Sequence, residues 1–600
     1  MPGGPGVGLG FCPAVLPDPV ARADCGAASE TTCAARGCCW SPVDGELGAA
    51  VPPCFRDTTV KNNNKGGVGA YQKIGFAPAA GLATQLVPGY NQVLLLEREF
   101  NGAQNGTHIY VLDTDNYDFE RDGFAYKPLT SKTDVFCHAG HVMPDGRALS
   151  VGGWTGEALR AVRILDRCDM AGYPGQCNFR ENQNAPNGAL QRPRWYPSTL
   201  GMPDGSVAVI GGATDIVPPG VNEPTIEFLP SKGGTLRNQL LVDSDGANLY
   251  PGAHVLWDNA QQAGRVFLFG GTIGALYDLN FNLVRNMPGS PVAPGGQRSY
   301  PLAGTTVLLP LSPENDYLPE IAACGGGTAV MGNFQPTNPA LNDCIRILPT
   351  IEGSIWVQEF MPYARVMPDM VVLPDGKYLI VNGAQQGYSG FGTAINPAYT
   401  ALIYDPKAPL GQRFTEGDTT DVARLYHSEA LLLPDGRVLI SGSTPNSNSN
   451  DPDVPGPTGA VFPTEYHLEV YLPPYLTSGA PRPVFAGIST AAWGYGQPVT
   501  MRTSVPSGNL NALRAVVLTN GAVTHATHMS QRHVTMVTQG VTGPDAEGFV
   551  NLTVTACPRA EVCPPGWYLL YVLDGETPSM GQWVQIGGDA GLGPGNFPGF

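Results

Sequence analysis

Three segments decide the fold of this chain: FCHAGHVMPDG at residues 136–146, WYPSTLGMPDG at 195–205 and YHSEALLLPDG at 426–436. Each ends in a Pro-Asp-Gly turn, and Cys137, Tyr196 and His427 stand seven residues before its proline. Equal offsets in a repeat predict structurally equivalent positions in successive units. If the units surround an axis, the three side chains meet at one point. A thiol, a phenol and an imidazole at one point are typical of metal and redox chemistry.

The turn belongs to a longer hairpin signature of two apolar runs around Pro-Asp-Gly, followed by Gly-Gly. Proline fixes φ for the turn, and glycine accepts the positive φ that closes it. The positions equivalent to Cys137 are 196, 250, 300, 367 and 427, about 58 residues apart, as in four-stranded propeller blades. Residues 66–475 are therefore predicted to form a kelch-type β-propeller of seven blades, with six or eight also compatible.

Composition also indicates an all-β protein. The 600 residues include 77 glycines and 57 prolines, and only 14% are charged, which is turn-rich β composition. The net charge of −17 argues against nucleic acid as a partner, because binding phosphates needs basic patches. No run reaches the ~18 apolar residues that span a bilayer. We expect a chain without a membrane span, and a monomer.

The thirteen cysteines indicate an oxidising compartment, so we expect a secreted protein, seen here without its signal peptide. Six cysteines lie in the first 54 residues, a piece too small to bury an adequate core without disulfides. Six others form three short-range candidate pairs, which leaves Cys137 alone. The candidate pairs are Cys168–Cys177, Cys324–Cys344 and Cys557–Cys563.

The cysteine spacing of residues 10–56, with RGCCW at 36–40, resembles a trefoil (P-type) domain. The resemblance implies a domain that binds a glycan, mucin or cell-wall ligand; a disulfide-held knob without a ligand is the alternative. It also implies three disulfides, Cys12–Cys39, Cys25–Cys38 and Cys33–Cys54.

After residue 480 the sequence changes to short alternating strands, and an immunoglobulin-like β-sandwich over 480–588 fits them. A Gly/Pro-rich segment at 589–600 is predicted to be a flexible tail. The sandwich contains GAVTHATHMSQRH at 521–533, which holds His525, His528 and His533. Alternate residues of a strand share a face, so His525 and His528 are expected to point opposite ways.

Tyr196, Tyr426, His427 and one histidine of the last domain would supply two oxygen and two nitrogen ligands. That set suits Cu(II). Tyr250 and Tyr300 occupy positions equivalent to Tyr196, so the repeat alone does not choose among the three tyrosines. Aromatic packing around the axis is the other interpretation of each.

Four motifs resemble the copper radical oxidases, galactose oxidase and glyoxal oxidase: FC at 136–137, WY at 195–196, LYHS at 425–428 and THATHMSQR at 524–532. NPAYTALIYDPKAPLGQRF and ARLYHSEALLLPDGRVLISGS look closest to the glyoxal oxidase branch. The resemblance spans about residues 70–588. It implies one copper ion, a protein-derived Cys-Tyr radical and no organic cofactor.

The resemblance also implies roles for the matching residues. Tyr196 would be an equatorial ligand, joined to Cys137 by a thioether, and would carry the radical. His427 and His525 would be imidazole ligands, His525 because it follows a threonine as in the family. Tyr426 would be the axial ligand and take the substrate's proton. Copper and the radical would each accept one electron, and O2 would re-oxidise the site and leave as H2O2.

The chain departs from galactose oxidase where that enzyme stacks a tryptophan over the crosslinked tyrosine, because residues 211–215 here read GGATD. Trp154, one unit earlier, is a candidate cover and substrate contact, and Gln385 and Arg298 are candidate substrate-binding residues. We expect a copper radical oxidase of small aldehydes (glyoxal or methylglyoxal type, through their hydrates) or primary alcohols. An alcohol or galactose-type oxidase is the alternative enzyme. A non-catalytic, glycan-binding propeller and trefoil protein is the alternative of another class.

Overall fold

The computed structural model describes residues 68–588, apart from 99–108, 119–122, 174, 183–188, 215–220, 247, 330–331 and 446–461. Of the first 67 residues it describes the backbone of three strands, paired in the order β1-β3-β2. These are β1 (Arg22–Asp24), β2 (Cys39–Trp40) and β3 (Cys54–Asp57). The predicted trefoil disulfides and the predicted tail at 589–600 lie outside the described residues.

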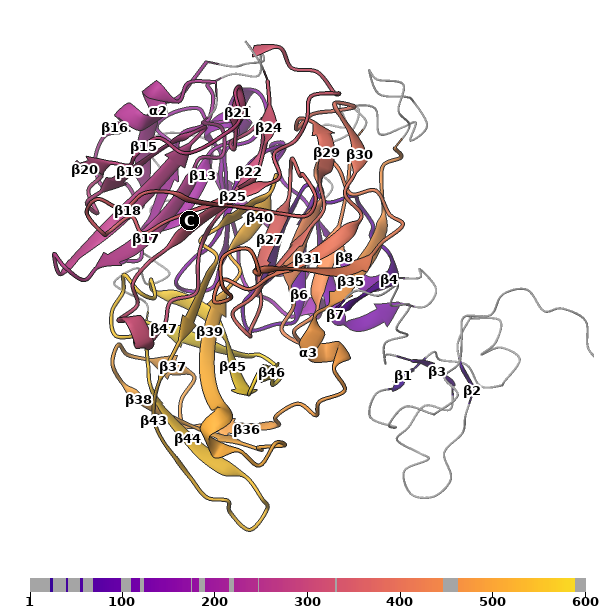
Figure 1. The fold of residues 1–600 in the computed structure, drawn as a ribbon. Helices are drawn as coiled ribbons and strands as arrows, with labels where there is room; N and C mark the ends of the chain where they lie inside the picture. The colour runs from indigo at the N-terminus through magenta and orange to yellow at the C-terminus, as the bar shows by residue number, and fades with distance from the viewer. Residues whose placement is uncertain are drawn as a thin grey trace, which may run out of the picture.

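The described chain is mostly β, with many four-stranded antiparallel sheets (Figure 1). Six such sheets have the strand orders β12-β11-β10-β9, β13-β14-β15-β16, β17-β18-β19-β20, β22-β23-β25-β26, β27-β28-β31-β32 and β33-β34-β35-β4. A seventh sheet joins β5–β8 to two strands from the C-terminal region, in the order β41-β40-β5-β6-β7-β8.

The strands of these sheets are short and apolar, and most inner ones are buried throughout. The first four sheets comprise β9 (Ala139–Val142), β10 (Ala148–Val151), β11 (Val162–Leu165), β12 (Arg180–Asn182); β13 (Ser198–Gly201), β14 (Val207–Ile210), β15 (Thr225–Leu229), β16 (Leu236–Arg237); β17 (Gly252–Asp258), β18 (Ala263–Gly270), β19 (Ile273–Tyr277), β20 (Leu283–Asn286); and β22 (Gly304–Leu308), β23 (Ile321–Gly325), β25 (Asp343–Ile347), β26 (Val357–Phe360). The other three comprise β27 (Asp369–Val372), β28 (Tyr378–Val381), β31 (Thr400–Tyr404), β32 (Phe414–Thr419); β33 (Glu429–Leu432), β34 (Val438–Ser441), β35 (His467–Leu472), β4 (Ala70–Phe76); and β5 (Ala83–Val87), β6 (Gln92–Leu96), β7 (Ile109–Asp118), β8 (Gly123–Leu129), β40 (Ala522–Thr524), β41 (Thr527–Met529). Short elements between them are β21 (Gly296–Gln297), β24 (Gly327–Thr328), β29 (Ala384–Gly387), β30 (Ala394–Pro397), α2 (Gln239–Asp243) and α3 (Pro474–Thr477).

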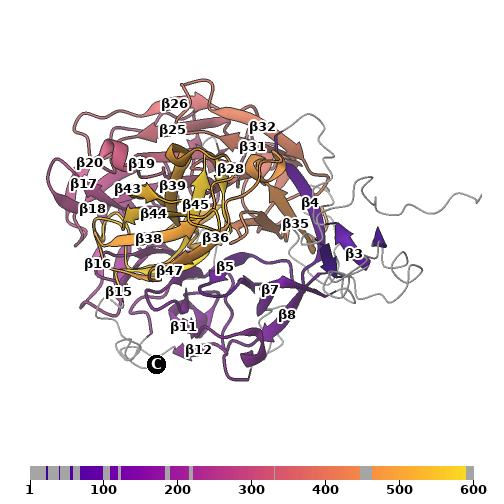
Figure 2. The same cartoon turned by 90° about the horizontal axis from the view of Figure 1, so that it is seen from below.

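The first strands of the seven sheets close a ring. Each first strand contacts the next one, in the order β5, β9, β13, β17, β22, β27 and β33, and β33 contacts β5 again. In Figure 2 the outer strands β8, β12, β16, β20, β26 and β32 lie around the circumference, with C-terminal strands over the middle. This arrangement is consistent with propeller blades. The ring closes through β4, because this strand from the start of the described chain completes the last sheet beside β35, with Tyr71 opposite Tyr471.

The Pro-Asp-Gly turns have the geometry that their residues predict. Gly146 has a φ of 87°, and its N–H donates to the carbonyl of Met143 (2.8 Å). The equivalent Gly205, Gly376 and Gly436 have φ values of 83°, 88° and 90°. Glycine adopts this left-handed region without the steric cost of a Cβ, so each copy closes its hairpin in the same way.

Residues 482–586 form two packed sheets around a shared apolar core that includes Val499, Met501, Val517 and Val572. One sheet holds β36 (Phe485–Ile488), β38 (Pro498–Thr503), β44 (Val550–Thr555) and β43 (Val537–Thr542). The other holds β37 (Ala492–Trp493), β47 (Gln582–Ile586), β45 (Gly566–Asp574), β39 (Leu513–Thr519), β42 (Arg532–Thr535) and β46 (Thr577–Pro578). The alternating strands after residue 480 therefore form a β-sandwich.

The sandwich docks on the Pro-Asp-Gly turns. Gln585 Nε2 donates to the carbonyl of Pro144 (2.9 Å), and the N–H of Gly581 donates to that of Pro434 (2.8 Å). His533 Nε2 bonds the carbonyl of Pro374 (3.2 Å). These carbonyls lie in the turns, outside the strand ladders, so the repeat that shapes the hairpins also presents acceptors to the second domain.

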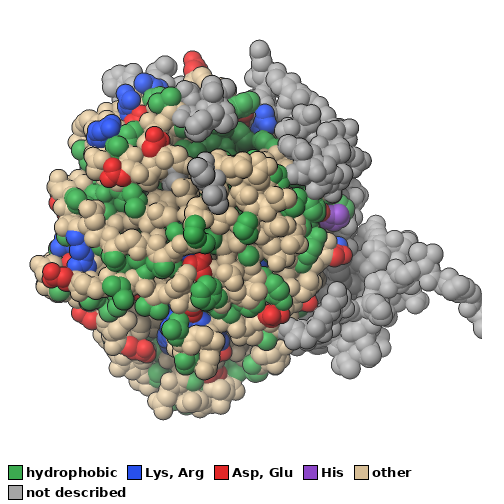
Figure 3. Space-filling model, turned by 45° about the horizontal axis from the view of Figure 1, so that its top comes forward, with side chains coloured by type: hydrophobic (Ala, Val, Ile, Leu, Met, Phe, Trp, Pro, Cys, Tyr) green, Lys and Arg blue, Asp and Glu red, His purple; other side chains and the backbone are tan. Residues whose placement is uncertain are grey.

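Three disulfides join described residues: Cys168–Cys177, Cys324–Cys344 and Cys557–Cys563. On the face in Figure 3, Lys and Arg side chains are interspersed with acidic ones rather than gathered into a basic patch. Among the described segments, no helix is both long enough and apolar enough to cross a bilayer.

Candidate metal centre

His525 reaches the middle of the ring at the tip of a hairpin from the C-terminal region. Thr524 of β40 pairs with Thr527 of β41, so His525 and Ala526 form a two-residue loop. Their φ values of 50° and 64° are those that a type I′ hairpin loop requires at both positions. Because β40 also pairs with β5, with Thr524 opposite Ala83, the hairpin is fixed to an innermost strand.

Five of the six repeat positions, all except Tyr300, share one backbone conformation. Cys137, Tyr196, Tyr250, Met367 and His427 all have φ between 49° and 63°. Non-glycine residues seldom adopt positive φ, so its recurrence at equal offsets marks a conformation that each unit imposes. Successive loops are also bonded, because the N–H of Tyr196 donates to the carbonyl of Cys137 (3.1 Å) and that of Tyr250 to Tyr196 (3.0 Å). The repeat thus aims these side chains at one region.

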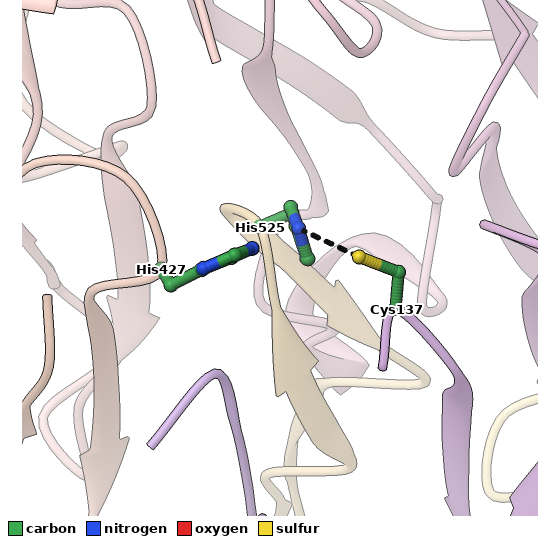
Figure 4. Close-up of side chains that lie close together, drawn as sticks. All are labelled: Cys137, His427 and His525. Atoms are coloured by element: carbon green, nitrogen blue, oxygen red, sulfur yellow. Dashed lines mark hydrogen bonds between the residues drawn. The ribbon is translucent and has the colours of Figure 1, made fainter. Parts of the chain in front are cut away.

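Cys137, His427 and His525 point toward one another from three separate elements (Figure 4). One ligand atom of each lies within 4.8 Å of the others, and Cys137 Sγ is 3.6 Å from His525 Nε2. The three side chains are only 0%, 2% and 3% exposed. Such a buried group of soft and borderline donors is consistent with a copper site.

Three phenol hydroxyls form a triangle beside this group. The hydroxyl of Tyr196 is 3.1 Å from that of Tyr300 and 3.4 Å from that of Tyr426, and the last two are 3.0 Å apart. The Tyr426 ring stacks on His427 with centroids 3.7 Å apart, and Tyr196 meets His525 edge-on at 5.6 Å. The structure thus brings together every metal ligand that the sequence predicted, and adds Tyr300.

Two threonines fix how the imidazoles face the site. Thr524 Oγ1 donates to the carbonyl of Leu82 (2.8 Å), so it accepts from His525 Nδ1–H (2.7 Å), which leaves a lone pair on Nε2. His427 Nδ1 is hydrogen-bonded to Thr444 Oγ1. His427 Nε2 is buried and has no hydrogen-bond partner among the described residues. A buried nitrogen without a partner is costly, and a metal ion would satisfy it.

Burial sets the protonation of the candidate ligands. It lowers the pKa of His525 to about 3 and that of His427 well below its usual value, so both rings are neutral near pH 7. Burial also raises the pKa of Tyr196 and of Tyr426 well above the usual phenol value. Neutral imidazoles bind metals directly, whereas each phenol must lose its proton when it becomes a ligand.

Cys137 is the one cysteine without a disulfide among the described residues, and it is fully buried. Burial raises the pKa of its thiol, and a hydrogen bond with Tyr196 opposes that shift. Of the three repeat tyrosines, Tyr196 is the one whose backbone N–H donates to the carbonyl of Cys137 (3.1 Å). This contact distinguishes Tyr196 from the two tyrosines that occupy equivalent repeat positions.

Arg298 is buried and held by several hydrogen bonds of its guanidinium. It is 2% exposed, and its guanidinium bonds Asp343 (2.7 Å) and the carbonyl of Gly325 (2.6 Å). Arg194 and Arg365 stand at the same offset, two residues before Tyr196 and Met367, and donate to equivalent carbonyls. The offset shows that Arg298 is a repeated structural arginine that ties neighbouring strands together, and its contact with substrate stays a prediction.

Trp154 and Gln385 are both half-buried. The Trp154 ring packs edge-on against Phe136 (5.8 Å), and the Arg98 guanidinium lies over it (4.8 Å). Among the described aromatic pairs, the rings that pair with Tyr196 are those of Trp195, Tyr250, Tyr300 and His525. Gln385 lies in β29, where its carbonyl accepts from Ala340 N–H (2.9 Å).

Sequence reasoning missed an aromatic wall beside the histidines. Phe136 meets His427 edge-on at 5.6 Å, and Phe391 meets Tyr426 edge-on at 5.2 Å. The two phenylalanine rings are stacked on each other, and the Arg98 guanidinium lies 5.0 Å from Phe136. Phe136 stands beside Cys137 in the motif and could have been found there. Phe391 and Arg98 lie outside the repeat offsets and gave no signal.

Three family models match the chain. Glyoxal oxidase N-terminus matches residues 112–475, the galactose oxidase-like Early set domain matches 482–586, and the trefoil (P-type) domain matches 12–57. The first alone covers more than half of the chain.

Curated relatives agree with these models. A WSC domain-containing protein of Arthroderma benhamiae is 37% identical over 83% of this chain and 50% of its own length, so the chain spans about half of that relative. Aldehyde oxidase GLOX of Vitis pseudoreticulata is 34% identical over 85% of this chain and 96% of its own.

A solved structure, a novel fungal alcohol oxidase in complex with copper, has the same fold with a TM-score of 0.63. The two sequences are 19% identical, and the matched region covers 86% of this chain and 99% of the alcohol oxidase chain. The family models, the relatives and the fold therefore agree. The chain belongs to the glyoxal oxidase family, as its motifs predicted, with a trefoil domain at its N-terminal end.

Proposed function

We propose that the protein is a secreted copper radical oxidase that oxidises small aldehydes, through their hydrates, or primary alcohols, and reduces O2 to H2O2. The observation that carries this proposal is the convergence of Cys137, Tyr196, Tyr426, His427 and His525 in one buried group. Two electrons and two protons leave the substrate, and O2 takes up both pairs. The disulfides support an oxidising, extracellular compartment.

The residues divide the work by their chemistry. His427, His525, Tyr196 and Tyr426 would hold one copper ion, which when bound would supply a Lewis acid and a one-electron acceptor. Tyr196 accepts the other electron, so no organic cofactor is needed. A thioether between Cys137 Sγ and the Tyr196 ring forms with loss of two hydrogens to O2, and its sulfur delocalises the radical.

The protein's own groups orient the reaction and move its protons. Thr524 and Thr444 hold the two imidazoles with their free nitrogens toward the site. The Tyr426 oxygen takes the proton of the substrate hydroxyl, and the Tyr196 oxygen takes the hydrogen from carbon. Phe136 and Phe391 exclude water from one side of the site. Burial of the whole group strengthens each of these interactions.

The architecture that we propose for this function has four parts. Residues 10–56 form the trefoil domain, which carries a glycan or cell-wall ligand, and 66–475 form a seven-bladed kelch-type propeller. The closed ring of seven first strands supports that blade count. Residues 480–588 form the immunoglobulin-like sandwich that donates His525, and 589–600 form a tail.

Aldehydes are the favoured substrates. The 34% identical relative that spans most of this chain is named an aldehyde oxidase, whereas the copper-containing alcohol oxidase resembles it in fold alone. Gln385 and Trp154 are proposed to contact substrate at the mouth. Replacing Gln385 with Ala should raise KM about fivefold, by the loss of one hydrogen bond of about 1 kcal/mol, with kcat nearly unchanged.

The proposal is tested by a peroxidase-coupled assay of copper-loaded protein with methylglyoxal, glyoxal, benzyl alcohol and galactose. We expect H2O2 with the two dicarbonyls above all. His525→Ala should abolish it, whereas His533→Ala should not, because that buried histidine bonds Pro374 away from the site. Copper binding without H2O2 from any substrate, even after a one-electron oxidant, would favour a glycan-binding module.

A further inference from the structure

Tyr300 lies between the two phenols that are proposed as ligands. Its hydroxyl is 3.1 Å from that of Tyr196 and 3.0 Å from that of Tyr426. Its ring is stacked on Tyr196, with centroids 4.5 Å apart and planes 26° apart. Tyr300 is half-buried, whereas Tyr196 and Tyr426 are 4% and 2% exposed. It therefore stands between the proposed radical and the outside of the site.

Tyr250 shows what the same residue does elsewhere in the ring. It meets Tyr196 edge-on, at 5.3 Å and 87°, and its hydroxyl donates to the carbonyl of His138 (3.1 Å). The packing of an aromatic ring around the middle of the ring of sheets thus requires neither stacking nor contact with the site's hydroxyls. Tyr300 makes both, so its contacts need another explanation.

Trp195 also packs on the Tyr196 ring, but it does not bond the Tyr196 hydroxyl as Tyr300 does. Trp195 lies 4.3 Å from Tyr196 with its plane tilted by 37°. Its indole has a single donor and no acceptor, and the indole nitrogen has no hydrogen-bond partner among the described residues. Among the described residues, Tyr300 alone both covers the Tyr196 ring and bonds its hydroxyl.

We propose that Tyr300 is a positioning residue of the radical site, an inference that rests on the proposed function. When Tyr196 is ionised as a ligand, its oxygen can only accept, so the Tyr300 hydroxyl is the donor of their 3.1 Å hydrogen bond, and it shares this one hydrogen with Tyr426 at 3.0 Å. This hydrogen bond stabilises the phenolate more than the neutral radical, and it raises the reduction potential of Tyr196. The Tyr300 ring covers one side of Tyr196 and lengthens the life of the radical. The hydroxyl and the ring thus have separable effects.

The two effects are separated by comparing native protein with Tyr300→Phe, Tyr300→Leu and the matched control Tyr250→Phe. Each copper-loaded protein is titrated with one-electron oxidants, and the radical is followed by its optical band and its decay. Without the hydroxyl, Tyr300→Phe should form the radical about tenfold more favourably, a potential lower by about 59 mV, with a native lifetime. Tyr300→Leu should show the same shift and a lifetime at least about tenfold shorter. Tyr250→Phe should show neither change.

The result that overturns the inference is a Tyr300→Phe potential equal to those of native protein and Tyr250→Phe. Tyr300→Phe preserves the ring and tests the inference even if Tyr300→Leu does not fold. Peptide mapping of the same native sample distinguishes a failure of the role of Tyr300 from a failure of the proposed function. A thioether and a radical in native protein, with no change in Tyr300→Phe, sink only the role of Tyr300. Neither thioether nor radical in native protein would overturn both proposals.

Discussion

Two neighbouring sheets of the ring carry a tyrosine at the same repeat position, yet the two tyrosines differ in what they can do. Tyr196, before β13, and Tyr250, before β17, have φ values of 58° and 49°. The Tyr196 hydroxyl meets those of Tyr300 and Tyr426, whereas the Tyr250 hydroxyl donates to the backbone of His138. The repeat therefore delivers a side chain to the middle of the ring without deciding its chemistry.

The two tyrosines differ because a different loop precedes each of them in the ring. Successive loops are hydrogen-bonded in order, so Tyr196 follows the loop of Cys137, and Tyr250 follows the loop of Tyr196. Of the two tyrosines, Tyr196 is therefore the one whose loop directly follows the loop that carries the thiol. A repeated scaffold thus acquires a reactive centre where two unlike residues occupy adjacent, equivalent positions. The predictions that follow test this contrast.

The largest effect is expected from removing one hydroxyl at each position. Tyr196→Phe should lower kcat by at least ~10⁴-fold, about 5.4 kcal/mol of barrier, because it removes a copper ligand and the group that takes one electron. Tyr250→Phe should keep kcat within about threefold of native. Steady-state H2O2 formation by copper-loaded protein measures both. Similar losses in the two variants would show that the equivalent positions are not functionally distinct.

The scaffold behind Tyr196 can be tested through its structural arginine. Arg194 is fully buried and bonds Glu227 at 2.8 Å. Arg194→Leu leaves Glu227 buried and unpaired, and should reduce the free energy of unfolding by roughly 3–5 kcal/mol. The surface pair Lys232–Asp204 of the same sheet is the control, and Lys232→Ala should cost less than about 1 kcal/mol. Equal losses of unfolding free energy in the two variants, measured by denaturant unfolding, would contradict the structural role of Arg194.

The proton acceptor should have a smaller effect than the radical tyrosine. Tyr426→Phe should lower kcat about 10²-fold, the usual contribution of a general base, while peptide mapping still finds the thioether. Retention of the thioether separates this role from that of Tyr196. Loss of the thioether in Tyr426→Phe would mean that Tyr426 assembles the site rather than moving a proton.

The smallest effect concerns a histidine outside the site. Burial, with Arg532 nearby, lowers the pKa of His254 from 6.5 to about 3. Between these values the unfolded chain binds a proton that the folded chain does not. Its contribution to stability is therefore complete above pH 6.5 and falls by about 1.4 kcal/mol per pH unit as the pH decreases toward 3. In metal-free protein, His254→Asn should make the pH dependence of unfolding shallower by that amount, and an unchanged slope would contradict it.

The sequence predicted what local chemistry dictates. Pro-Asp-Gly specifies its turn, so the repeat offsets could be read directly, and these offsets correspond to one backbone conformation at Cys137, Tyr196 and His427. The β-sandwich after residue 480 could be read from strand alternation. The family motifs added His525, which alternation alone could not choose over His528, a residue whose Nε2 in fact bonds Asp369 at 2.9 Å.

Features that depend on long-range pairing could not be predicted. Nothing local indicates that β4 completes the last sheet, or that Thr524-His525-Ala526-Thr527 is a hairpin loop, because the loop lacks the glycine or asparagine typical of such turns. The stacking of Tyr300 on Tyr196 joins two sheets that are not neighbours in sequence order. The structural role of Arg298 could have been read from its offset before Tyr300, which equals that of Arg194 before Tyr196.

Peptide mapping after aerobic copper loading tests the central claim most directly. We predict that the peptides containing Cys137 and Tyr196 are recovered as one crosslinked species, lighter than their sum by two hydrogens, while those of Tyr250 and Tyr300 are unmodified. Recovery of Cys137 and Tyr196 as separate, unmodified peptides from fully copper-loaded protein would contradict the account.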